Sequence, residues 1–106
     1  MNSYLVILKN KRKGELSNDL LIRHVTYLKK LSKQGSLKLC GPFADNDGAL
    51  MIYLAESIEE VEKLLNNDPF ICDKYYQAYK IKEFIEANEE NNWLMGGEQI
   101  QENLKD

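Results

Sequence analysis

The chain has 106 residues, of which 43% are hydrophobic and 29% are charged, and its formal net charge is −3. This length is that of one domain with a single modest core. The negative charge argues against nucleic acid or an anionic membrane as the main partner, because both attract positively charged proteins.

The sequence shows neither a membrane span nor a secretory signal. No stretch approaches the ~20 apolar residues that a spanning helix needs, and a strand pattern follows Met1 without the basic and apolar regions of a leader. Cys40 and Cys72 lie far apart and have no metal-ligand spacing. We therefore expect a cytoplasmic protein with reduced thiols, in which both cysteines are buried and structural.

The first two predicted elements are a strand and a helix. Residues 3–9 predict a central strand, because both of its faces are apolar. Residues 17–34 predict an amphipathic helix, with Ser17 as its N-cap and Gly35 as its stop. Its apolar face holds Leu21, His24, Val25, Leu28 and Leu31. His24 is the only histidine, and a group that titrates near neutral pH stands there in place of a leucine.

The next elements are a hairpin, a helix and a last strand. Residues 37–40 predict a strand that Gly41 and Pro42 interrupt, which places it at a sheet edge because proline donates no ladder hydrogen bond. Residues 49–55 are continuously apolar and predict a second central strand. Residues 57–66 open with a capping box and predict a helix. Asp68 and Pro69 fit the start of a short helical turn, and residues 76–85 alternate as a fourth strand.

The element order is β-α-β-β-α-β, which predicts the α+β class and a ferredoxin-like fold. Such a fold is a four-stranded antiparallel sheet with two helices on one face. The two central strands are apolar on both faces, so the second face of the sheet also needs a cover. We expect a second copy to supply it in a homodimer; the alternative is cover by the tail.

The predicted domain spans residues 1–85, and residues 86–106 form an acidic tail. Six acidic residues in this tail face one lysine, yet Trp93, Leu94 and Met95 form an apolar cluster. Two interpretations stay open: a tail without fixed structure, or a segment that docks Trp93 onto its own or a neighbouring subunit.

The sequence offers few groups that could carry chemistry. It contains no Gly-rich phosphate loop, zinc-ligand spacing, nucleophile elbow or paired-cysteine redox motif, so we expect neither a metal nor another cofactor. The remaining polar candidates are His24, Asp68, Asp45, Asp47, Arg23 and the tyrosines. Among such groups an imidazole can take up a proton, and a carboxylate can orient it. For His24 the plainer alternative is a hydrogen-bonded core histidine, and for Asp68 it is an N-cap. Arg23, Asp45 and Tyr4 are by default a surface charge, a turn residue and a core aromatic.

A combination of short motifs resembles the YciI-like (YCII-related) family over about residues 3–84. The run H-x-x-Y-L-x-x-L-x-x-x-G-x-L begins at His24, the pair G-P follows at residues 41–42, and D-P-F stands at residues 68–70. The resemblance implies a ferredoxin-like fold and a dimer in which two sheets form a barrel-like assembly. It also implies a catalytic dyad, which falls on His24 and Asp68.

The resemblance also bears on the pocket. The family includes a dehydrochlorinase of a chlorinated hydroxyquinol and is similar in fold to muconolactone isomerases. Many relatives continue after D-P-F with a small glycine-containing turn, whereas this chain continues with bulkier, more polar residues at 71–76. We expect the substrate pocket to include Tyr4, Arg23, Gly41, Pro42, Asp45 and Phe70.

Two functions from different classes remain. The first is a small cofactor-independent enzyme that isomerises, or eliminates a group from, a small cyclic or aromatic molecule, with His24 as acid and base and Asp68 as its orienting partner. The alternative is a dimeric module that binds a small ligand, or assists a larger enzyme, without turnover. A deep polar pocket that joins His24 to Asp68 favours the enzyme, and an apolar or closed pocket favours the binding module.

Overall fold

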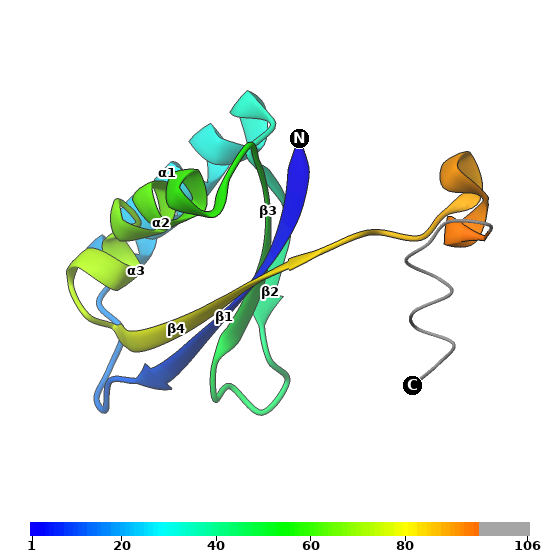
Figure 1. Ribbon diagram of the computed structural model, residues 1–106. Helices are drawn as coiled ribbons and strands as arrows, with labels where there is room; N and C mark the ends of the chain where they lie inside the picture. Colours follow the sequence, from blue (N-terminus) through cyan, green and yellow to red (C-terminus); the bar gives the residue numbers. More distant parts are fainter. Residues whose placement is uncertain (96–106) are drawn as a thin grey trace.

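The computed structural model describes residues 1–95. It contains a four-stranded antiparallel sheet with the strand order β2-β3-β1-β4, and the helices cover one face of that sheet (Figure 1). This confirms the predicted α+β class and ferredoxin-like element order. The elements are β1 (Asn2–Lys11), α1 (Asn18–Gln34), β2 (Leu37–Pro42), β3 (Ala49–Ala55), α2 (Ile58–Asn66), α3 (Pro69–Cys72), β4 (Tyr76–Phe84) and the short 3-10 helix η1 (Glu89–Leu94).

The strand positions follow from residue type. The two strands with apolar residues on both faces, β1 and β3, lie in the middle of the sheet. Strand β2 lies at one edge and has Pro42 as its last residue, which agrees with the missing N–H of proline. One face of the central strands packs under α1 and α2 and forms the core. The main core residues are Tyr4, Val6, Leu8, Leu20, Leu31, Met51, Tyr53, Val61 and Leu65.

Helix α1 begins and ends as predicted. The Ser17 hydroxyl accepts a hydrogen bond from the N–H of Leu20 at 3.1 Å, and Gly35 takes the left-handed conformation (φ 79°) that closes the helix. The predicted apolar face is only partly correct. Leu20, His24 and Leu31 are buried, whereas Leu21 and Val25 are 40% and 37% exposed. These two side chains lie beside the buried face and line a cavity instead of the core.

The prediction of buried cysteines is wrong, because both thiols belong to exposed residues. Cys40 lies on the edge strand β2, where no further strand covers it. Cys72 ends the four-residue helix α3, and its thiol donates to the backbone carbonyl of Asn66 at 3.0 Å. Each element buries a different residue, Leu37 in β2 and Phe70 in α3, and residue type alone does not reveal which side of its element a cysteine occupies.

The face of the sheet opposite the helices carries a second set of apolar side chains. Leu5 pairs with Ile52, Ile7 pairs with Leu50, and Leu39 of β2 is 51% exposed beside them. Beyond β4 the chain runs away from the helices towards η1 (Figure 1). Trp93 is 54% exposed there, so within residues 1–95 it is not buried against the chain's own core.

Candidate functional site

His24 and Asp68 meet beneath helix α1. The Nδ1 atom of His24 lies 2.7 Å from the Oδ1 atom of Asp68, although the two residues are 44 positions apart. Asp68 is completely buried, and His24 is 9% exposed. A buried carboxylate at hydrogen-bond distance fixes which ring nitrogen remains free, because Nδ1 is engaged and Nε2 is not.

Local capping chemistry holds Asp68 in place. Its Oδ1 atom also accepts the N–H of Phe70 at 3.0 Å, which makes Asp68 the N-cap of α3 with Pro69 at the first helical position. Its backbone N–H donates to the carbonyl of Leu65 at the end of α2. The other oxygen, Oδ2, has no hydrogen-bond partner within residues 1–95. The carboxylate is therefore both the predicted cap and the partner of His24.

The ring of His24 is fixed by an aromatic stack. Phe70 lies parallel to it, with 3.6 Å between the ring centroids and 5° between the planes. Phe70 in turn contacts Tyr75 at 4.7 Å and Tyr76 at 5.9 Å between ring centroids. This packing restrains rotation of the imidazole, so that the hydrogen bond to Asp68 is held in one orientation.

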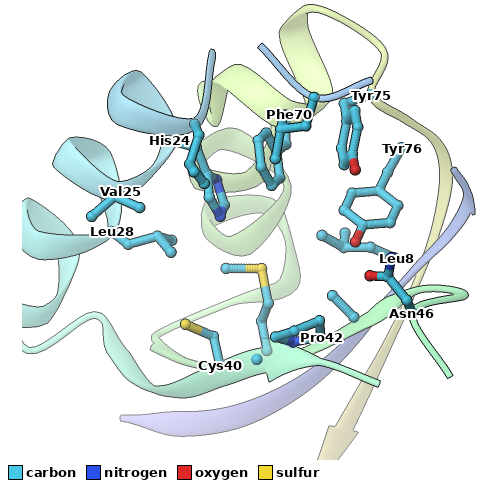
Figure 2. Close-up of a pocket in the computed structure, with 15 residues that line it drawn as sticks. Leu8, His24, Val25, Leu28, Cys40, Pro42, Asn46, Phe70, Tyr75 and Tyr76 are labelled. Atoms are coloured by element: carbon cyan, nitrogen blue, oxygen red, sulfur yellow. The ribbon is translucent and has the colours of Figure 1, made fainter. Parts of the chain in front are cut away.

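A cavity of about 380 Å³ opens beside this pair, between α1, the β2–β3 end of the sheet and the start of β4 (Figure 2). Its volume lies near the lower end for small-molecule pockets. Most of its walls are apolar, and none of its lining residues is Lys, Arg, Asp or Glu. The lining residues are Leu8, Leu16, Leu21, His24, Val25, Leu28, Cys40, Gly41, Pro42, Asn46, Ala49, Met51, Phe70, Tyr75 and Tyr76.

Three of the six predicted pocket residues line this cavity: Gly41, Pro42 and Phe70. The other three lie elsewhere. Tyr4 is buried in the core, opposite Tyr53. The guanidinium of Arg23 is paired at the surface with two carboxylates, those of Asp19 and Asp73.

The last of these, Asp45, shapes the β2–β3 turn, where its carboxylate accepts the N–H of Asp47 at 3.0 Å. For these three residues the structure agrees with the plainer alternatives, which were a core aromatic, a surface charge and a turn residue.

Sequence reasoning missed several lining residues. Tyr75 and Tyr76 fall in the segment after D-P-F that departs from the family pattern, so a signal was present there. Asn46 belongs to a turn, and its residue type is explained by that turn alone. Cys40 is predicted inside the core. Finding these residues requires knowing that the β2–β3 turn and the start of β4 lie at the same end of the sheet.

The Cys40 thiol and the Tyr76 hydroxyl, which both line the cavity, have raised pKa values. Desolvation and the nearby Asp68 carboxylate raise the pKa of the Cys40 thiol, and desolvation, with a smaller effect of Tyr75, raises the pKa of the Tyr76 hydroxyl. Near neutral pH the first is therefore a thiol and not a reactive thiolate, and the second is a hydrogen-bond donor.

Neither a metal cluster nor a membrane span appears in the described part of the chain. No group of three His, Cys, Asp or Glu side chains among residues 1–95 could hold a metal ion. None of the helices in this range combines the length and the apolar character that crossing a membrane needs.

Comparisons with known proteins place the site in a wider context. The family model of the YCII-related domain matches residues 3–85. Uncharacterized protein YjpA of Bacillus subtilis (strain 168) is 26% identical over 69 residues, which are 65% of this chain and 81% of that protein.

A solved structure is also similar: 5-chloro-2-hydroxyhydroquinone dehydrochlorinase (TftG) from Burkholderia phenoliruptrix AC1100, in complex with 2,5-dihydroxybenzoquinone. It is 25% identical, covers 84% of this chain and 99% of its own chain, and has a TM-score of 0.56.

Proposed function

The chain belongs to the YCII-related domain family, and from this premise we propose that it is a small cofactor-independent enzyme that works by acid–base chemistry. The observation that carries the proposal is the contact of 2.7 Å between His24 Nδ1 and the fully buried Asp68, at the wall of a cavity large enough for a small ring. A histidine oriented by a buried carboxylate is an arrangement that moves protons.

The proposed mechanism follows from the hydrogen bond. With Nδ1–H donating to Asp68, the lone pair of Nε2 is available to a molecule in the cavity. Nε2 takes a proton from a carbon or hydroxyl of the substrate, and the carboxylate balances the charge of the imidazolium. In an isomerisation the imidazolium returns the proton to a different atom. In an elimination the electron pair released by deprotonation expels a leaving group, such as chloride, from the substrate.

The substrate class is proposed from the cavity and from the similar structure. Aromatic and aliphatic walls without Lys, Arg, Asp or Glu suit a small cyclic or aromatic molecule better than a phosphorylated one. TftG is described as a dehydrochlorinase of a chlorinated hydroxyhydroquinone and was solved with a dihydroxybenzoquinone. A related ring chemistry in this chain is consistent with both observations.

A screen of small rings tests the proposed chemistry. The protein is incubated in deuterated water with hydroxylated six-membered rings, including a chlorinated hydroxyhydroquinone, and proton NMR follows exchange of carbon-bound protons while an electrode follows chloride. We expect exchange or chloride release above the protein-free rate for at least one ring. Tight binding of a ring with neither exchange nor release would instead support the alternative function.

That alternative is a binding module without turnover, and one observation favours it. The cavity walls are mainly apolar, which suits retention of a small ligand as well as catalysis. The buried carboxylate behind His24 argues for the enzyme, since ligand retention alone gains little from an ionisable pair at its edge.

We also propose that two copies pair through the open face of the sheet. Leu5, Ile7 and Leu50 lie on this face, and Lys80 and Lys82 of β4 flank them. An apolar centre with a charged rim is the pattern of a subunit interface, and residues 1–95 supply no helix that covers this face (Figure 1).

Replacing Ile7 by lysine is expected to convert a dimer into a monomer at micromolar concentration, because the interface would bury an unpaired charge. Sedimentation velocity measures the change. The matched control is Ile22→Lys, which places the same charge at a residue of α1 that is 64% exposed. A wild-type monomer, or an Ile7→Lys dimer as stable as the wild type, would contradict the proposed interface.

A further inference from the structure

The wall of the cavity opposite His24 carries polar groups without an assigned role, which are the hydroxyls of Tyr75 and Tyr76 and the amide of Asn46. In Figure 2 the hydroxyl of Tyr76 and the amide of Asn46 lie on the side of the cavity away from His24, and both residues belong to its lining. We propose that these two groups form a second polar contact that binds an oxygen on the far edge of a planar, uncharged ring whose near edge faces His24. The proposal rests on the proposed function, since it names the substrate class of the same cavity.

Both groups are free to contact a ligand. Within residues 1–95, neither side chain forms a hydrogen bond with another residue, whereas Tyr27 and Tyr53 donate to the Leu64 carbonyl and the Met51 sulfur. The raised pKa of Tyr76 keeps its hydroxyl protonated as a donor. The amide of Asn46 offers both a donor and an acceptor, so that a hydroxyl and a carbonyl oxygen are both suitable partners.

The backbone holds Asn46 at the cavity. Its N–H donates to the carbonyl of Phe43 at 2.8 Å, and its φ of 62° is a left-handed conformation that asparagine tolerates. The turn approaches β1 closely at Gly48. A Cβ atom, which glycine lacks, would lie there only 2.7 Å from the carbonyl oxygen of Leu8. This contact fixes the turn against the sheet and keeps the amide at the cavity rim.

Aromatic packing fixes Tyr76. Its ring meets that of Tyr75 edge-on, with 5.1 Å between centroids and 79° between planes, and only 5% of the residue is exposed. The register places it opposite Lys11, at the end of the sheet that also holds the β2–β3 turn. The hydroxyl is therefore presented by a rigid side chain, which makes it suited to discriminate between ligands.

The walls between the two polar ends define the rest of the ligand. Leu8, Pro42 and Met51 are apolar, and none of the lining residues is Lys, Arg, Asp or Glu. A carboxylate or phosphate on the ring would lose its hydration without gaining a cationic partner other than His24. These features favour a neutral ring with oxygen substituents on two opposite edges, of the hydroquinone type, over a ring with one oxygen.

The test compares hydroquinone with phenol, which differ by one hydroxyl on the far edge. Dissociation constants are measured by NMR titration without oxygen, so that no quinone forms to modify the exposed cysteines. Wild type is expected to bind hydroquinone about three- to tenfold more tightly than phenol, the effect of one added hydrogen bond. Tyr76→Phe and Asn46→Gly are each expected to bring this ratio towards one while phenol affinity stays unchanged; glycine keeps the left-handed turn.

The matched control is Tyr79→Phe, which removes a hydroxyl from the same strand outside the cavity lining and is expected to keep the wild-type ratio. Equal affinities in wild type, or an unchanged ratio in both cavity variants, would overturn the second contact. So would the absence of measurable binding of either ring at millimolar concentration. The experiment measures binding and not turnover. The ratio of the two affinities therefore tests the second contact even if His24 does not catalyse, and the two proposals can fail separately.

Discussion

Replacing His24 by asparagine is expected to lower the rate of proton exchange by about 10²- to 10⁴-fold, the usual contribution of a general acid or base. The amide of asparagine can donate to Asp68 where Nδ1 does now, so the buried carboxylate keeps its partner. It has no lone pair that can take a proton in place of Nε2. Deuterium uptake into the best ring of the substrate screen measures the loss, and circular dichroism verifies the fold.

Thr26→Asn is the matched control for this variant. Thr26 is an exposed residue of the same helix, so the new side chain is identical but does not face the cavity. We expect its exchange rate to equal that of wild type. If His24→Asn were folded and retained the wild-type rate, His24 would not be the acid or base, and the interpretation as a core histidine would hold.

The sequence was sufficient for most of the fold because each element has a local cause. Strands β1 and β3 have apolar residues on both faces and lie in the middle of the sheet. Strand β2 ends in Pro42, which lacks an N–H for a further strand, and it lies at an edge. Ser57 accepts the N–H of Glu60 as the predicted cap of α2. The second half of the capping box is shifted, since the Glu60 carboxylate accepts the N–H of Glu56 and not that of Ser57.

The candidate site was less predictable because its geometry is not local. Periodicity places His24 on a buried face, and Pro69 marks the preceding Asp68 as a cap. Neither pattern gives the distance between these two side chains, which are 44 positions apart in the sequence. The motif resemblance suggested the pair, and the structure places the two side chains together. Cavity walls such as Asn46 and Cys40 depend on how the β2–β3 turn and the start of β4 converge on α1, which residue type and spacing do not encode.

Asp68 allows the two roles of one carboxylate to be separated by two substitutions. Asp68→Asn keeps an oxygen that accepts from both His24 and the N–H of Phe70, but it removes the negative charge that balances an imidazolium. We expect near-wild-type stability and a loss of exchange rate of roughly 10²- to 10⁴-fold. Asp68→Ala removes the cap and leaves the N–H of Phe70 unpaired, so its unfolding free energy should fall by about 2 kcal/mol as well.

Urea unfolding and deuterium uptake together distinguish the roles, with Ser57→Ala as the control. Ser57 is the N-cap of α2 and lies outside the cavity lining, so its loss should lower stability by about 1 kcal/mol and leave exchange unchanged. If Asp68→Asn behaved like wild type in both measurements, Asp68 would be a cap alone. If it lost exchange at full stability, the charge of Asp68 acts on His24, because the hydrogen-bonded geometry would be the same in both proteins.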